Sequence, residues 1–232
     1  MDRRSAWQTP PTPEPPRPES LWLATTDPTD YDSLSDDLAV DIAVVGGGIA
    51  GLTAAIELVD AGRTVSVLET DRIVEGVTGH TTAKLTAQHG LRYDFLLDRF
   101  DEQTARTYAE ANEEAIDAIE RRAATLGVDC DFQRTPAYTY ADSRSDVAAV
   151  RDEARAAQQV GLPASLVEET PLPFPVEAAV RFDEQALFRP RKYLPAVADA
   201  VHGDGSTVIE RTTVLEIDGG QPSRSTISLP SR

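Results

Sequence analysis

Residues 41–51 read Asp-Ile-Ala-Val-Val-Gly-Gly-Gly-Ile-Ala-Gly, a short apolar run that leads directly into the spacing Gly46-x-Gly48-x-x-Gly51. This pattern is typical of a strand that turns into a helix around a pyrophosphate. Gly46 permits the tight turn, Gly48 permits close approach of the phosphates, and Gly51 lets the helix pack on the strand. Because glycine triplets also occur in ordinary turns, the flanking sequence has to support this interpretation.

The flanking sequence predicts a complete βαβ unit. We expect a helix over about residues 49–60 that ends at Ala61-Gly62, and a second strand over residues 64–68. Ile49 and Ala50 lie in the first helical turn, whose free N–H groups and positive dipole end face the phosphates. A glycine turn in some other α/β domain is the alternative interpretation.

Glu69 follows the predicted second strand, eighteen residues past Gly51. An acid at this place lies at the carboxyl end of the sheet, where its oxygens accept hydrogen bonds from the adenosine ribose. A 2′-phosphate would meet a carboxylate there. We therefore expect a dinucleotide with an unphosphorylated ribose.

The glycine motif leaves FAD and NAD open, and the stretch 76–90 bears on the choice. It is rich in glycine, threonine and histidine, whereas an NAD domain normally proceeds directly to its next helix and strand. A loop dense in hydroxyl groups suits a second wall around a bulky cofactor. The same composition is as typical of a polar surface loop.

Residues 41–52, 68–72 and 76–90 resemble the FAD-dependent oxidoreductases of the glycine and D-amino-acid oxidase class. The sequence is most similar to the subgroup with a C-terminal Rieske domain, and the resemblance covers about residues 20–218. It implies an α/β fold, with a Rossmann-like FAD/NAD(P)-binding domain and part of an α+β substrate domain. It also implies FAD as cofactor and oxidation of an amine or amino acid at its C–N bond, by hydride transfer to the flavin.

The resemblance implies cofactor contacts from several segments, and no acid–base residue among them. The pyrophosphate would be surrounded by Gly46, Gly48, Ile49, Ala50 and Gly51. Glu69, with Thr70 beside it, would bind the ribose, and Arg72 would lie near the phosphates. The flavin ring and ribityl chain would be approached by Thr78, Thr81, Thr82, Ala83 and Lys84. Val214, on a late strand, would contact adenine through its backbone. The catalytic residue stays unassigned.

Cysteine and histidine usage departs from the Rieske subgroup. A Rieske centre needs two cysteines and two histidines, whereas this chain has only Cys130 and three scattered histidines, His80, His89 and His202. We expect no Rieske centre and no metal site. His80 is the better functional candidate, either near the flavin N5 or hydrogen bonded to backbone. Cys130 has no neighbouring cation that would favour a nucleophilic role.

The family's second half has no counterpart after Asp218. Residues 213–218 predict a strand and Gly219-Gly220 a hairpin turn, but the tail 219–232 is polar and contains none of the 39 acids. We expect the N-terminal part of a longer flavoenzyme with an atypical tail, as an early stop or a shifted reading frame would produce. A chance acid-free tail is the alternative.

Element signals between these segments predict a mostly helical middle region. We expect helices over 102–126, capped by Asp101 and stopped by Gly127, and over 145–160. A strand is expected at 138–140. Pro190 opens a third helix that ends near 201, kinked or delayed by Pro195, and residues 207–210 return to the nucleotide-binding sheet. The basic residues of this helix form either a substrate carboxylate site or, as we favour, a solvated cap: Arg189, Arg191 and Lys192.

The domain organisation follows from these elements. Residues 1–36 are proline-rich and expected to be largely disordered. Residues 37–100 form the FAD-binding unit and flavin loop, 101–188 the helical and partial substrate domain, 189–218 the return to the FAD-binding domain, and 219–232 the tail.

Composition narrows the function classes. A formal charge of −17 argues against nucleic acid. Lysine occurs only at Lys84 and Lys192, and this arginine-based, acidic composition indicates adaptation to high salt rather than an acidic docking surface, because the acids form no block. No apolar run reaches about 18 residues and no leader is evident, so the cytoplasm is expected. The oligomeric state stays open.

Three functional hypotheses follow. The first is a flavin oxidoreductase acting on a small amine or amino acid, incomplete in this chain. The second is a noncatalytic truncated remnant, motivated by the unfinished hairpin and the tail. The third is an NAD-binding module, motivated by the βαβ unit.

Overall fold

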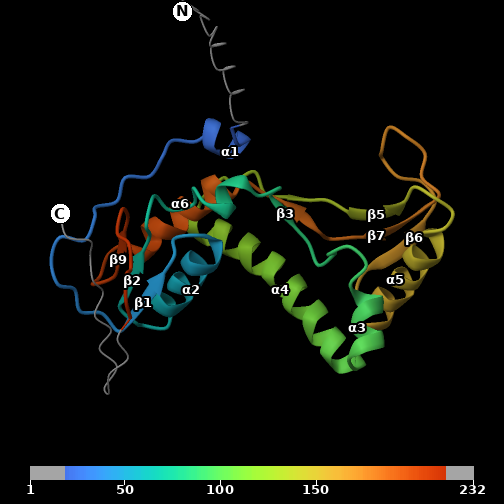
Figure 1. Cartoon of the computed structure of the whole chain (residues 1–232), viewed down its shortest axis with the longest axis horizontal. Coiled ribbons are helices and arrows are strands. Elements are labelled where there is room, and N and C mark those ends of the chain that lie inside the picture. Colours follow the sequence, from blue (N-terminus) through green and yellow to red (C-terminus); the bar gives the residue numbers. More distant parts are fainter. Residues whose placement is uncertain (1–18, 218–232) are drawn as a thin grey trace, which may run out of the picture.

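The computed structural model describes residues 19–217, which form two lobes joined by a long helix (Figure 1). Its helices are α1 (Leu21–Ala24), α2 (Ile49–Asp60), the 3-10 helix η1 (Val77–His80), α3 (Tyr93–Arg99), α4 (Glu102–Leu126), α5 (Val147–Gln159) and α6 (Pro190–Val201). Its strands are β1 (Ile42–Val45), β2 (Val65–Leu68), β3 (Lys84–Leu85), β4 (Gln133–Arg134), β5 (Ala137–Ala141), β6 (Ala164–Val167), β7 (Ala178–Phe182), β8 (Ala186–Leu187) and β9 (Thr207–Ile209). Within residues 19–217, no helix has the length and hydropathy that a membrane crossing needs.

The first lobe contains the predicted βαβ unit. Its parallel sheet has the order β1-β2-β9, with Ile42 opposite Val65 and Ser66 opposite Thr207. Helix α2 packs on this sheet and against α6 (Figure 1). Leu52 of α2 is fully buried in the core between them. The Rossmann-like part of the predicted fold is therefore confirmed.

The second lobe is an antiparallel sheet of order β5-β7-β6, covered by α5 with α3 beside it (Figure 1). A smaller antiparallel sheet, β3-β8-β4, lies in the segments that connect the lobes. The side chain of Phe182 is fully buried in the core of this lobe and stacks on Tyr93. The α/β fold class, with an α+β second part, is confirmed.

Helix α4 contributes to both cores. Ala105 and Ala109 near its start are buried in the second lobe, and Ala123 near its end is buried in the first. Its bounds agree with the sequence prediction because both ends carry strong local signals. The Asp101 carboxylate accepts a hydrogen bond from the Thr104 N–H at 2.7 Å, and Gly127 adopts a left-handed φ of 63°.

One element prediction needs correction. Residues 213–217, the described part of the predicted 213–218 strand, form no strand. The chain after β9 instead follows the loop after β2, where the Thr212 N–H donates to the Glu69 carbonyl at 2.9 Å. Helix α6 begins at Pro190, as predicted, because proline suits the first helical turn. Pro195 lies inside the helix and does not delay its start. The predicted hairpin turn and tail lie outside the described residues.

The segment 20–34 is ordered along the first lobe, although the sequence predicted residues 1–36 as largely disordered. The Trp22 indole N–H donates to the Thr81 carbonyl at 2.7 Å. Farther along, the Leu34 N–H donates to the Thr212 hydroxyl at 3.1 Å. These partners lie far away in the sequence, so no local signal announces them. Residues 1–18 lie outside the described part.

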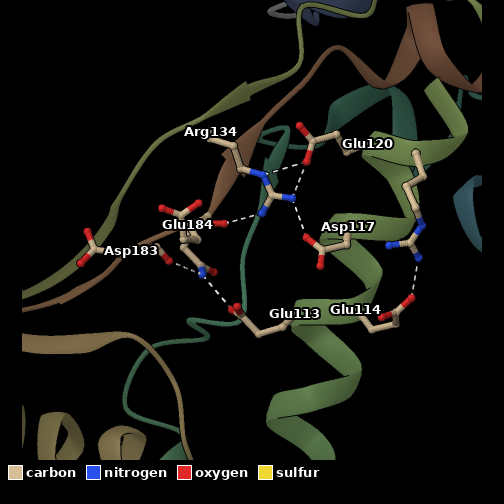
Figure 2. Close-up of polar contacts among 9 residues, drawn as sticks. Glu113, Glu114, Asp117, Glu120, Arg134, Asp183 and Glu184 are labelled. Carbon is tan, nitrogen blue, oxygen red and sulfur yellow. Dashed lines mark hydrogen bonds and ion pairs between the residues drawn. The ribbon is translucent and has the colours of Figure 1, made fainter. Parts of the chain in front are cut away.

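An acidic face of α4 is joined to the connecting strands by one arginine (Figure 2). The Arg134 guanidinium binds Asp117 at 2.6 Å and donates to the Glu184 carbonyl at 2.7 Å. Its Nε also donates to Glu120 at 3.0 Å. One turn earlier, Glu113 accepts a hydrogen bond from the side-chain amide of Gln185, the residue before β8. Burial raises the pKa of the Glu113 carboxyl group. Arg134 thus neutralises part of a crowded acidic surface.

We expect Arg134→Gln to lower the free energy of unfolding by about 1 kcal/mol in dilute buffer and by less in concentrated KCl, since salt screens the acids that lose their partner. Urea unfolding at both salt concentrations measures this. Arg151→Gln, which removes the same charge from the exposed surface of α5, is the control. An equal loss at both salt concentrations would contradict the neutralising role.

Candidate functional site

A cavity of about 620 Å³ opens at the carboxyl edge of the parallel sheet. Its walls come from the segments that follow β1, β2 and β9, and from η1. The lining residues are Gly48, Glu69, Asp71, Arg72, Val74, Glu75, Gly76, Val77, Thr78 and Arg211. The edge of a parallel sheet beyond its carboxyl ends is where open α/β folds bind ligands.

The glycine turn brings α2 very close to β1. A Cβ on Gly51 would lie 1.9 Å from the Gly46 carbonyl oxygen, so only glycine allows this contact. Gly46 itself has a φ of 106°, in the left-handed region that favours glycine. Gly47 faces Ile73, whose Cγ2 would lie 2.4 Å from an added Cβ. The predicted packing role of Gly51 and turn role of Gly46 are therefore confirmed.

The N-terminus of α2 offers backbone donors beside the cavity. In the part of the chain that the structure describes, the N–H groups of Gly48, Ala50 and Gly51 have no hydrogen-bond partner. The Ile49 N–H donates to the Thr78 hydroxyl at 3.1 Å. Free N–H groups at a helix N-terminus favour an anion, because the helix dipole is positive there.

Glu69 lies at the end of β2 and lines the cavity, as predicted. Its carboxylate accepts hydrogen bonds from the N–H groups of Gly47 at 2.7 Å and Asp71 at 3.2 Å. It thereby joins the glycine turn to the loop after β2. Thr70, next to it, is exposed.

Arg72 also lines the cavity, and its Nε is buried without a hydrogen-bond partner among the described residues. A buried donor that stays unpaired costs about 1–3 kcal/mol. A bound phosphate would relieve this cost and be attracted by the positive charge. The donor set of Arg72 and the α2 N-terminus thus fits a dinucleotide pyrophosphate.

The predicted flavin loop is only partly at the cavity. Thr78 is buried and lines it, whereas residues 81–84 are not among the lining residues. Thr82 and Lys84 are exposed. Ala83 is buried with a φ of 61°, and its carbonyl accepts a hydrogen bond from the Phe188 N–H at 3.2 Å.

Val214 does not lie on a strand, so the prediction of a late strand that carries Val214 is wrong. It is half-buried and is not among the lining residues. Arg211, which sequence reasoning missed, lines the cavity instead. The available signal was position: like Glu69, it follows a buried strand of the parallel sheet.

The remaining candidates have structural partners. His80 is exposed, and its Nδ1 lies 2.9 Å from the Gly76 carbonyl oxygen, the backbone role considered for it. Burial raises the pKa of the Cys130 thiol, which opposes thiolate formation. Arg191 is buried rather than a solvated cap, and donates to the Val74 carbonyl at 3.3 Å. Residues 19–217 hold no group of three or more side chains suited to a metal ion.

A parallel sheet, a glycine turn and an acid after the second strand define the class of Rossmann-like dinucleotide-binding proteins. The family of FAD dependent oxidoreductases (DAO) matches residues 41–227. The chain belongs to this family.

Relatives with known names agree with this assignment. A putative Rieske 2Fe-2S iron–sulfur protein, YhfW of Bacillus subtilis, is 34% identical over 204 residues, which is 88% of this chain and 40% of that protein. Gamma-glutamylputrescine oxidoreductase of Escherichia coli is 32% identical over 44% of this chain and 24% of its own length. The chain therefore spans less than half of these relatives.

A solved structure shows the same fold. L-Amino acid deaminase from Proteus myxofaciens, in complex with anthranilate, superposes with a TM-score of 0.67 at 13% identity. The match covers 84% of this chain and 43% of that one.

We expect Gly51→Ala to lower the free energy of unfolding by more than about 2 kcal/mol, because the new methyl group would overlap the Gly46 carbonyl and push α2 off the sheet. Thermal unfolding followed by circular dichroism measures this. Gly48→Ala is the control, since its Cβ would meet only the Thr78 hydroxyl, at 3.2 Å. Equal stability of the two variants would contradict the close helix–strand contact.

Proposed function

We propose that this chain forms the FAD-binding part of an oxidoreductase that oxidises a small amine or amino acid at its C–N bond. The observation that carries the proposal is the unpartnered, buried Arg72 Nε at a cavity that the α2 N-terminus also borders. Membership of the FAD dependent oxidoreductase family supports FAD over NAD as the dinucleotide.

The chain's own residues would bind the central pyrophosphate of FAD and the two halves of the cofactor on either side of it. The N–H groups of Gly48, Ala50 and Gly51 would hold the pyrophosphate together with Arg72, while the Ile49 N–H donates to the Thr78 hydroxyl beside them. Glu69, with Thr70 beside it, would hold the ribose. Thr78 and the segment 81–84 would approach the flavin, and Val214 stays a prediction for the adenine side.

The reaction itself would use the redox chemistry of the bound flavin, which accepts a hydride. The protein contributes orientation and exclusion of water. The substrate class rests on the names of relatives, which include gamma-glutamylputrescine oxidoreductase, L-amino acid deaminase and glycine oxidase. This chain spans less than half of each of these relatives. The proposed activity is therefore that of a full-length protein of this family, to which this chain would contribute the FAD-binding part.

We expect the purified chain to bind FAD at one per chain in concentrated KCl. A titration followed by the visible flavin spectrum and by quenching of flavin fluorescence measures the stoichiometry. NAD is the comparison ligand. A folded chain that binds no FAD would contradict the proposal and favour a noncatalytic remnant, and preferential stabilisation by NAD would favour the NAD-binding module.

We expect Arg72→Gln to weaken FAD binding about tenfold or more, since it removes a charged donor from the pyrophosphate. Arg99→Gln, which removes an arginine at the end of α3 in the other lobe, is the matched control. The same titration measures both variants. If both bind FAD like the unmodified chain, Arg72 does not contact the pyrophosphate.

A further inference from the structure

The buried carboxylate of Glu210 lies beside the loop that carries Arg72. Glu210 directly follows β9 and is 0% exposed. Its Oε1 accepts a hydrogen bond from the Ile73 N–H at 3.0 Å and another from the Thr29 hydroxyl. Its Oε2 accepts a hydrogen bond from the Tyr31 N–H at 3.1 Å. Several donors therefore compensate the burial of this carboxylate, which would otherwise be very costly.

The backbone on either side of Glu210 runs along the loop after β2. The Glu69 N–H donates to the Ile209 carbonyl and the Thr212 N–H to the Glu69 carbonyl, both at 2.9 Å. The Arg211 N–H donates to the Asp71 carbonyl at 2.8 Å. These bonds hold the loop as far as residue 71. The Glu210 side chain extends the contact to Ile73, two residues farther.

Ile73 transmits this contact to the glycine turn. It is fully buried, and its side chain fills the space that a Cβ on Gly47 would occupy. The neighbouring Val74 N–H donates to the Gly47 carbonyl at 3.0 Å. Glu210 therefore holds the N–H group of Ile73, which lies between Arg72 and Val74, the residue bonded to the glycine turn.

We propose that Glu210 is a positioning residue for the cofactor pyrophosphate. It fixes residues 72–74 against the glycine turn, so that the Arg72 guanidinium and the α2 N-terminus face the same anion. Glu210 does not line the cavity and acts mainly through Ile73. Its Oε2 also lies 3.7 Å from the guanidinium of Arg211, which lines the cavity. This proposal rests on the proposed binding of FAD.

Glu153 provides a closely matched control. It lies on α5 in the second lobe, is also 0% exposed, and also accepts three hydrogen bonds. The donors are the N–H groups of Arg92 and Tyr93 to Oε1 and of Asp94 to Oε2, at 2.9–3.0 Å. Glu153→Gln and Glu210→Gln thus make the same change to equally buried acids, one remote from the cavity and one behind it.

Two readouts test the proposal. The first is trypsin cleavage of the Arg72–Ile73 bond in the chain without FAD, followed by mass spectrometry. We expect Glu210→Gln to speed this cleavage about tenfold or more, because glutamine is uncharged and keeps only one of the two acceptor oxygens, so its NH₂ group faces a donor that then has no acceptor. The second is FAD titration, where we expect binding about tenfold weaker or worse. Glu153→Gln should change neither, although it too lowers stability.

Unchanged cleavage and unchanged FAD affinity in Glu210→Gln would overturn the proposal, as would equal effects of Glu153→Gln. If Glu210→Gln does not fold, Glu210→Asp replaces it, since its shorter side chain keeps the charge but does not reach Ile73. If the unmodified chain binds no FAD, the proposed function fails by itself. The cleavage comparison then still decides whether Glu210 positions the loop.

Discussion

The close contact between α2 and β1 is the constraint on which the first lobe depends. Because Gly51 lets the helix approach to where its backbone touches the Gly46 carbonyl, α2 lies flat on the sheet and its N-terminus reaches the carboxyl edge. That placement leaves one side of α2 for α6 and leaves free N–H groups at the cavity. The same close approach leaves no room at Gly47, so Ile73 and the loop after β2 must take one particular path.

Features with local causes were predictable from sequence. The βαβ unit is announced by glycine spacing, and α4 by its cap at Asp101 and its stop at Gly127. The path of the loop after β2 was not, because its partners come from distant segments, as in the bonds from Ile73 to Glu210 and from Arg191 to Val74. Val214 shows the same limit, since a favourable strand composition forms no strand without a neighbouring strand to pair with.

Acidic residues serve two different purposes in this chain. On the surface of α4 they pair with arginines, as Asp117 and Glu120 do with Arg134 (Figure 2). Inside, Glu153 accepts hydrogen bonds from backbone N–H groups, and Glu210 from two backbone N–H groups and a hydroxyl, with the Arg211 guanidinium 3.7 Å from its Oε2. Each holds a segment from another part of the chain, so an acid in the core here organises loops that regular secondary structure does not pair.

The pairing of β2 with β9 has a consequence for synthesis on the ribosome. Ser66 lies opposite Thr207, so the entire second lobe is made between two adjacent strands of the first. The third strand cannot join the sheet until the chain has emerged past β9, and closing so long a loop is entropically costly and slow. A folded second lobe shortens that loop by bringing its ends together. The loop-closure cost is therefore lowest when the second lobe, in the middle of the nascent chain, folds before the parallel sheet of the first lobe is completed.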